Sequence, residues 1–306
     1  MAACTTTEIE SRYDSISFQP VAAKATKAII DGTSYPTSES FAVSAYHNGT
    51  AEYFADLTAS YSSQEQLWET STAEYWPLGG SLTFNAYSPA SAGLTISASG
   101  VSVADYTVQT AAQMTTDLCY ASATVADCAQ HPASVPLTFS HALSQVVFRV
   151  KAADYYNTNG STFSLAMTSL TMDGILSVGD FASSATPLWS NVETEHSYTL
   201  SSTSTALTYN AQNQPNTLDV CANLFIPQTL GDDACINVAY SLTQTVSGET
   251  YTMTNSPVTI GLNSTIAEWE PGKKYIYTLS IGLNNLITFT ATAADWTEQS
   301  GGVVVE

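Results

Sequence analysis

The stretches KYIYTLSIGL, residues 274–283, and ITFTATA, residues 287–293, decide the class of fold. In both, apolar side chains recur at every second position. The apolar positions are Tyr275, Tyr277, Leu279 and Ile281 in the first stretch, and Ile287, Phe289 and Ala291 in the second. Successive residues of a β-strand point to opposite faces, so this period of two predicts two half-buried strands.

The same alternation recurs along the chain, as in SLTFNAYS (residues 81–88) and INVAYSLTQ (residues 236–244). Glycine, asparagine and proline clusters such as HNG, PLGG, NTNG and EPGKK separate these runs, as is typical of antiparallel sheets with short connections. We therefore predict an all-β protein built as β-sandwiches. The proline-containing stretch AQHPASVP divides two strand-rich halves, which places the domains at residues 1–135 and 136–306.

The charge of the chain excludes one class of partner. It contains 27 acidic and 7 basic residues, a formal net charge of −20. Nucleic acids are bound by clustered lysine and arginine, so no nucleic acid partner is expected. Three of the basic residues, Arg12, Lys24 and Lys27, precede residue 28, and none follows until Arg149.

The five cysteines point to an exported protein. Cys4 follows two alanines, as does the lipidated cysteine of a bacterial lipoprotein signal, and we expect the apolar part of that signal upstream of Met1. The other four form two pairs that are close in sequence, Cys119 with Cys128 and Cys221 with Cys235. Two local disulfides would suit an oxidising compartment, with buried free thiols as the alternative.

No pattern in the chain predicts catalysis, a cofactor or a metal site. The histidines are single and far apart, no thiol–metal spacing accompanies the cysteines, and the common catalytic motifs are absent. A pair of convergent carboxylates, as in glycosidases, needs no motif and remains an alternative. The five tryptophans, Trp68, Trp76, Trp189, Trp269 and Trp296, are expected in the core rather than on a sugar-stacking surface.

Four stretches together resemble the fimbrillins of Bacteroidales, the Mfa-like or type V pilins. They are YWPLGGSLTFNAYSP (75–89), LTFSHALSQVVFRV (137–150), LFIPQTL (224–230) and WEPGKKYIYTLSIGLNNLITFTATAADW (269–296). The resemblance implies two tandem transthyretin-like β-sandwich domains and no enzymatic activity. It also implies export as a lipoprotein to the outer membrane and a place in a cell-surface fimbria, with other fimbrial subunits as partners.

The resemblance further implies how such subunits assemble. A trypsin-like protease removes the first strand, here ISF at residues 16–18, and a strand from another subunit replaces it. The family pattern favours arginine where this chain has Lys27. Cleavage is therefore expected after Lys24 or Lys27 by a lysine-tolerant protease, or at Arg12, or not at all in a subunit that stays anchored.

The C-terminal end offers a candidate donor strand. Val303, Val304 and Val305 follow a Gly-Gly pair and form a β-branched run, which fits either a donor strand or an ordinary edge strand. The alternative function is a surface carbohydrate-binding or adhesive module that does not polymerise, as a tip or anchor, recognising a host or bacterial surface ligand.

Overall fold

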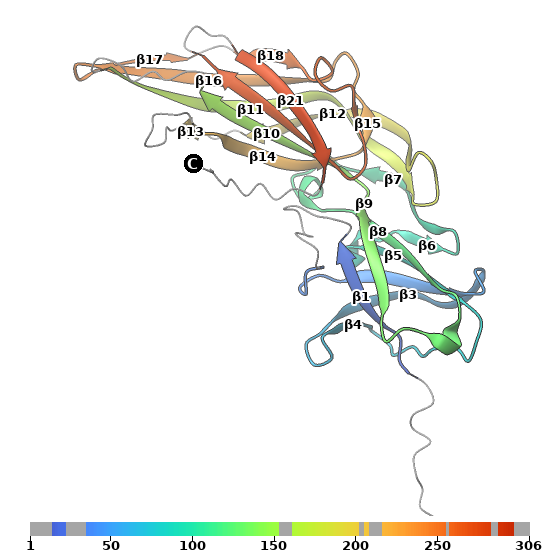
Figure 1. Cartoon of the computed structure of the whole chain (residues 1–306). Coiled ribbons are helices and arrows are strands. Elements are labelled where there is room, and N and C mark those ends of the chain that lie inside the picture. The colour runs from blue at the N-terminus through green and yellow to red at the C-terminus, as the bar shows by residue number, and fades with distance from the viewer. Residues whose placement is uncertain are drawn as a thin grey trace, which may run out of the picture.

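In the computed structural model, strands form nearly all of the regular structure, which confirms the all-β class. The structure describes residues 14–22, 35–152, 161–201, 205–207, 216–254, 257–282 and 287–296. A barrel forms one end of this elongated arrangement and a pair of sheets forms the other (Figure 1).

The N-terminal body is a closed barrel of seven strands rather than two separate sheets. Around the barrel they are β1 (Ser17–Ala22), β4 (Leu67–Thr70), β3 (Ala51–Ser62), β2 (Phe41–His47), β5 (Leu82–Ser88), β8 (Cys119–Val125) and β9 (Val135–His141). All neighbours pair antiparallel except β1 and β9, which are parallel. The aromatic side chains of Phe18, Phe41, Phe84 and Phe139 fill its core.

The second body consists of two larger sheets and a short two-stranded one. The four-stranded sheet has the order β14 (Leu218–Phe225), β10 (Ser144–Ala152), β20 (Lys273–Ile281) and β21 (Ile287–Asp295). The eight-stranded sheet contains β17 (Glu249–Thr254), β16 (Cys235–Val246), β11 (Ser161–Ala182), β7 (Gly100–Thr107), β6 (Thr95–Ser97), β12 (Trp189–Ser201), β13 (Thr205–Leu207) and β18 (Val258–Gly261). The pair is β15 (Gln228–Thr229) with β19 (Glu268–Trp269).

The strands predicted from the opening stretches are β20 and β21, and their alternation has the predicted consequence. Tyr275, Tyr277, Leu279 and Ile281 are all buried, whereas every second residue between them is partly exposed. β20 and β21 pair antiparallel, with Tyr277 opposite Ala291. Three short 3₁₀ helices, η1 (Ala90–Ala92), η2 (Gln113–Thr115) and η3 (Cys128–Gln130), complete the regular elements of the described residues.

The barrel extends past residue 135, where the sequence predicted the boundary between the domains. β9 begins at Val135, ends at His141 and pairs with β1 and β8, so it belongs to the barrel. The stretch AQHPASVP marks only the loop that leads into this strand. In addition, β6 and β7 belong to the N-terminal half of the sequence but are part of the eight-stranded sheet of the second body, where β7 pairs with β11. The division in space therefore does not follow a single cut in sequence.

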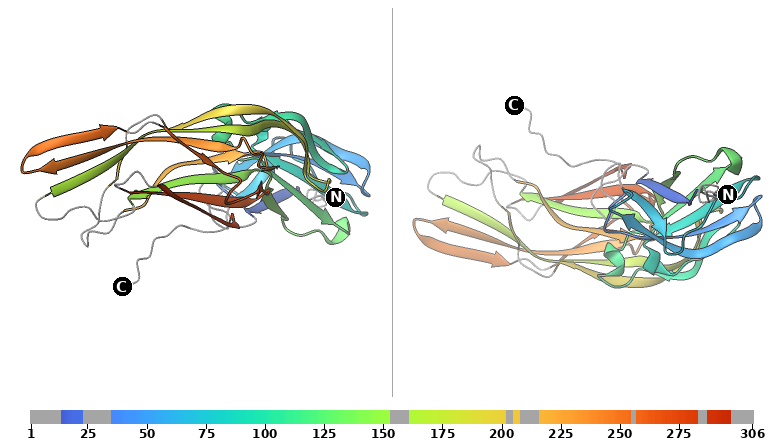
Figure 2. Two further views of the ribbon diagram at one scale, coloured as in Figure 1. Left: turned by 90° about the horizontal axis from the view of Figure 1, so that it is seen from above. Right: turned by 90° about the horizontal axis from the view of Figure 1, so that it is seen from below.

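The hairpin β16–β17 and the adjoining part of β11 project from the end of the molecule far from the barrel (Figure 2). All residues of β17 are exposed, among them Tyr251 and Met253.

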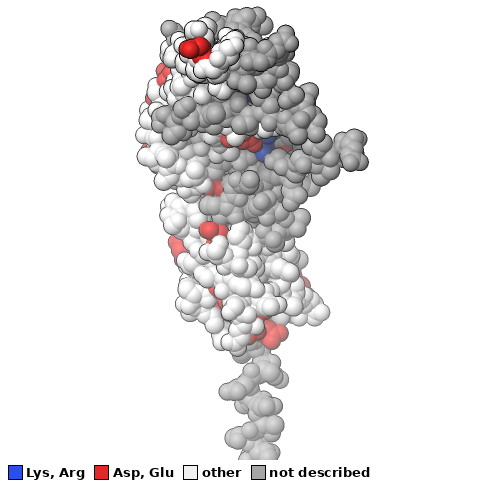
Figure 3. Space-filling model, turned by 90° about the vertical axis from the view of Figure 1, so that its left-hand side faces the viewer, with Lys and Arg blue, Asp and Glu red and all other residues white. Residues whose placement is uncertain are grey.

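On the face shown in Figure 3, acidic side chains are dispersed over the surface and basic ones are confined to one small area. Two of the basic residues are paired with carboxylates, Arg149 with Asp219 and Lys273 with Asp295.

A glycine allows the long strand β11 to bend. Gly174 has φ of +70° and lies between Met172 and Ile175, where the pairing with β12 shifts register. A Cβ atom at this position would lie 2.3 Å from the carbonyl oxygen of Asp233. No side chain fits there without moving the backbone.

Replacing Gly174 with alanine should lower the free energy of unfolding by at least about 2 kcal/mol, because a left-handed L-residue costs roughly 1–2 kcal/mol and the methyl group also overlaps a carbonyl. Urea denaturation measures the loss. Gly231→Ala is the control, because no atom lies within 4 Å of its added Cβ. Its effect should stay within about 0.5 kcal/mol, and equal losses at the two sites would contradict this account.

Candidate functional site

Strand β1 closes the barrel from a position between two other strands. On one side it pairs antiparallel with β4, Ser17 opposite Glu69. On the other side it pairs parallel with β9, from Phe18 opposite Val135 to Ala22 opposite Phe139. Figure 1 shows β1 and β9 side by side along the barrel wall. Without β1, both β4 and β9 would present unpaired backbone groups.

The inward side chains of this segment are part of the barrel core. Ile16 and Phe18 are buried, and the Phe18 ring makes edge-to-face contacts with Phe41 and Phe84 at centroid distances of 5.7 and 5.6 Å. Gln19, which points outward, is exposed. The stretch ISF, predicted as the first strand, thus provides two core side chains, and β1 itself continues to Ala22. We call the space occupied by Ile16 and Phe18 between β4 and β9 the β1 seat.

The predicted processing and anchoring residues lie outside the described residues. These are Cys4, Arg12, Lys24 and Lys27, and the same holds for Val303, Val304 and Val305 at the other end. In sequence, β1 lies between Arg12 on one side and Lys24 and Lys27 on the other. The remaining four basic residues, Arg149, Lys151, Lys273 and Lys274, lie in the paired strands β10 and β20.

The structure describes Cys119, Cys128, Cys221 and Cys235 without a disulfide between them. Cys119 opens β8 and Cys128 follows the other end of that strand, and six residues of extended chain span about 20 Å. A disulfide requires Cα atoms within about 7 Å. Cys221 and Cys235 lie in different sheets, on β14 and β16. These positions favour the alternative of free thiols for all four.

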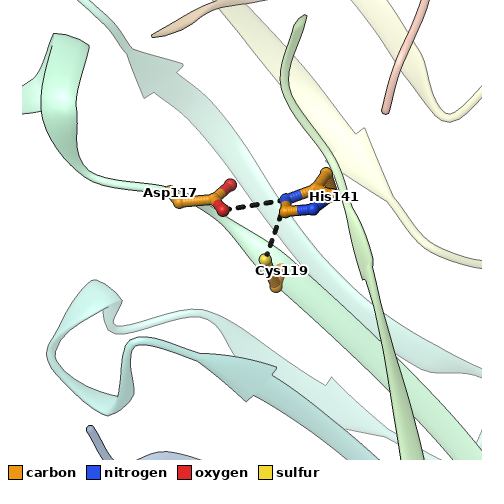
Figure 4. Close-up of side chains that lie close together, drawn as sticks. All are labelled: Asp117, Cys119 and His141. Atoms are coloured by element: carbon orange, nitrogen blue, oxygen red, sulfur yellow. Dashed lines mark hydrogen bonds and ion pairs between the residues drawn. The ribbon is translucent and has the colours of Figure 1, made fainter. Parts of the chain in front are cut away.

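A buried polar cluster lies where the barrel meets the second body. It consists of Asp117, Cys119 and His141 (Figure 4). The Nδ1 atom of His141 lies 2.8 Å from Oδ2 of Asp117 and 3.5 Å from Sγ of Cys119. Cys119 and His141 are direct cross-strand partners of β8 and β9, and Asp117 precedes β8 by two residues.

Packing from the second body covers this cluster. The Trp296 ring stacks on the His141 ring with a centroid distance of 4.0 Å. The adjacent backbone is also held across the junction, because Trp189 donates its Nε1–H to the carbonyl of Ala142 and Gly272 donates its N–H to Leu143. A cleft of about 240 Å³ reaches His141 and is lined by Tyr120, Ser140, His141, Leu188, Pro271 and Gly272.

The geometry of the cluster does not match a nucleophilic relay. In such a relay the nucleophile and the orienting carboxylate bind different nitrogens of the histidine, but here both lie against Nδ1. Burial raises the pKa of the Cys119 thiol well above its ordinary value, and the Asp117 carboxylate raises it further. Such a thiol stays protonated and is a poor nucleophile.

Sequence patterns do not indicate this cluster. Asp117 and Cys119 are two residues apart, so they share one face of an extended segment, but His141 joins them only through the pairing of β8 with β9.

The predicted core position of the tryptophans is confirmed, because all five are buried. A sugar-stacking surface made of these tryptophans is therefore wrong.

The comparison with known families identifies the chain. The profile described as fimbrillin-like matches residues 26–296. The chain belongs to the fimbrillin-like family. The match begins after β1 and ends at Trp296, and thus includes the rest of the barrel and the second body. A comparison of this fimbrillin-like chain with curated proteins finds no significant match.

Solved structures share the fold of this fimbrillin-like protein. One is a proposed cell adhesion protein from Bacteroides ovatus, with a TM-score of 0.53 and 17% identity over 94% of this chain and 99% of that one. Another is a proposed cell adhesion protein from Bacteroides uniformis, with a TM-score of 0.52 and 16% identity over 93% and 100%. At these identities the likeness concerns the fold alone.

The contribution of the β1 seat can be measured by truncating its central side chain. Phe18→Ala should lower the stability of the barrel by about 3–5 kcal/mol, because a fully buried ring is lost. Chemical denaturation gives the loss, and hydrogen exchange of β2 and β9 peptides assigns it to the barrel. The exposed neighbour provides the control, with Gln19→Ala changing stability by less than about 0.5 kcal/mol. Similar losses for both variants would mean that β1 is not anchored through its inward face.

Proposed function

We propose that this fimbrillin-like protein is a structural subunit of a cell-surface fimbria. In this proposal β1 is a temporary strand that is removed and replaced by a strand of another subunit. The observation that carries it is the position of β1, which completes the barrel between β4 and β9. A segment with this position holds the barrel closed before assembly and leaves a defined seat when it departs.

The chemistry of the seat supports replacement rather than simple loss. Removal of β1 exposes the backbone edge of β9, over five paired positions, and the apolar surface that covers Ile16 and Phe18. Burying one large apolar side chain contributes about 1.5–3 kcal/mol, so an empty seat has a strong tendency to accept another strand. The replacing strand needs alternating apolar side chains and a free backbone edge.

The distribution of basic residues supports proteolytic release. Lys24 and Lys27 follow β1 in sequence and Arg12 precedes it, whereas residues 28–148 contain no lysine or arginine. A trypsin-like protease that cuts after Lys24 or Lys27 would separate β1 from the chain and leave it held by pairing and packing alone. The basic residues of β10 and β20 lie in paired strands and are poor substrates.

Strand replacement between copies leads to a fibre. The donor strand and the seat are different parts of the subunit, so the contact is heterologous and leaves a free seat at one end and a free donor at the other. The run Val303–Val305 is our candidate for the donor, through its β-branched composition. Other fimbrial subunits and a processing protease are the partners in this proposal.

Export and anchoring form the remaining part of the proposal. Lipidation of Cys4 would attach the precursor to the outer membrane, and an uncut subunit would remain there as a base component. No enzymatic role is proposed, since the Asp117–Cys119–His141 cluster does not match a nucleophilic relay.

Adhesion to a surface ligand is a second candidate function, favoured by the exposed Tyr251 and Met253 on β17 at the far end of the molecule.

A reversible lock on β1 tests the assembly mechanism. Ser17 and Glu69 are paired residues of β1 and β4, so the double variant Ser17→Cys, Glu69→Cys can tie β1 to the barrel after cleavage. After limited trypsin digestion, the parent protein should lose β1 and form multimers. The oxidised variant should be cut equally well and stay monomeric until a reductant is added. Light scattering after size exclusion and negative-stain microscopy measure both states.

Two outcomes would contradict the mechanism. One is a parent protein that loses β1 and remains monomeric, and the other is a locked variant that multimerises at the parent's rate. Lys24→Gln, Lys27→Gln is the matched control for the cleavage site, and it should retain β1 covalently under the same digestion. Sequencing the N-terminus of the protein from cells then distinguishes a lipidated Cys4 from a start after Lys24 or Lys27.

A further inference from the structure

The Asp117–Cys119–His141 cluster brings three different donor atoms together at one point of the junction. The carboxylate oxygen, the thiol sulfur and the imidazole nitrogen all lie within 4.8 Å of one another. They come from two elements that are fixed by pairing, since Cys119 is opposite His141 and the N–H of Ala142 bonds to the carbonyl of Leu118. The sheet therefore positions Cys119 and His141, and Asp117 lies two residues before β8, next to the Leu118 carbonyl that is bonded to Ala142.

The spacing of the donors suits a tetrahedral metal ion. With bonds of about 2.0–2.3 Å, neighbouring donors in a zinc site lie roughly 3.2–3.7 Å apart. The distance of 3.5 Å between Sγ of Cys119 and Nδ1 of His141 already has this value. The distance of 2.8 Å between Nδ1 and Oδ2 of Asp117 needs to increase by only about 0.5 Å.

The cluster is deeply buried and incompletely satisfied. Asp117, Cys119 and His141 are 2%, 1% and 6% exposed. The second carboxylate oxygen of Asp117, Oδ1, has no hydrogen-bond partner, and neither has Nε2 of His141. A buried carboxylate is costly unless a cation or a full set of hydrogen bonds compensates it. An ion bound by Asp117, Cys119 and His141 would compensate the carboxylate charge, and a water molecule would take the fourth tetrahedral position.

We propose that Asp117, Cys119 and His141 form a binding site for a divalent transition-metal ion of the zinc type. The mixture of thiolate, imidazole and carboxylate selects zinc-like ions over calcium or magnesium, which prefer oxygen donors. The charges also balance, because a thiolate and a carboxylate together neutralise one dication in this buried site. The cleft lined by Tyr120, Ser140 and Pro271 reaches His141 and provides a route from solvent.

Binding has a defined proton balance. The Cys119 thiol releases its proton to solvent and its sulfur binds the ion. The lone pair of Nδ1 binds the ion, so the imidazole proton is carried by Nε2 and not by the nitrogen that now lies against Asp117. The hydrogen bond between Nδ1 and Asp117 is replaced by bonds of both groups to the metal. The ion would then join the start of β8 to the end of β9 beneath Trp296.

Cobalt binding to the whole purified chain tests the site. After treatment with a chelator and its removal, titration with Co²⁺ should give one equivalent of bound metal, with the near-ultraviolet charge-transfer band of a thiolate ligand and the visible bands of a tetrahedral ion. Zn²⁺ should displace the cobalt and raise the unfolding temperature by at least about 4 °C, because an ion bound only to the folded state stabilises it.

Two matched variants assign the signal. Cys119→Ser should abolish the charge-transfer band, whereas Cys128→Ser should keep it, because Cys128 is equally buried in the barrel but lies outside the cluster. Asp117→Asn keeps the size of the side chain and should weaken cobalt binding at least tenfold. Circular dichroism establishes that each variant is folded.

The proposal is overturned by either of two results. The first is a folded parent protein that shows no thiolate band with Co²⁺ and contains no metal after growth with zinc, which would leave only a hydrogen-bonded Asp117–His141 pair. The second is a band that persists in folded Cys119→Ser, which would assign the ion to another thiol. The first result is obtained with the parent protein alone. The proposal can therefore be tested even if Cys119→Ser does not fold.

Discussion

The structure depends on the insertion of one short strand, β1, between β4 and β9. These two strands are adjacent only through β1, so the hydrogen-bond ladder of the barrel closes at this segment. Among the described strands of the barrel, β1 and β9 are the one parallel pair of neighbours. This pairing joins the first described residues of the chain to a strand more than one hundred positions later. The closure therefore depends on a contact between residues far apart in sequence. The side chains of Ile16 and Phe18 anchor it in the core.

Strand β9 connects this closure to the rest of the molecule. Its first five residues pair with β1, and its last residues carry His141 to the junction with the second body. There the Trp296 ring covers the His141 ring, and β10 begins three residues later as a central strand of the four-stranded sheet. A change in the β1 seat is thus linked through one continuous backbone segment to the packing of the two bodies. Of the buried Asp117–Cys119–His141 cluster, His141 lies on this segment and meets the other two through the pairing of β9 with β8.

The predictions from sequence succeeded where local patterns correspond to local structure. Alternation predicted both β20 and β21, with buried inward side chains in β20 and half-buried ones in β21, because the period of two is a property of a single strand. The tryptophans were correctly expected in the core. The barrel continues past the predicted boundary after residue 135, because proline and small polar residues mark a loop, and a loop within a barrel has the same composition as a linker between domains.

The sequence alone determined the all-β class, the membership of the fimbrillin-like family, the acidic surface charge and the restriction of basic residues to a few positions, because each of these follows from composition, local periodicity or motif order. Only the tertiary structure decided that the four described cysteines lie apart from one another, that β6 and β7 join the sheet of the second body, and that a carboxylate, a thiol and an imidazole converge. These features arise from pairing between strands distant in the chain, and the register of such pairs is set by the packing of the whole core rather than by either strand.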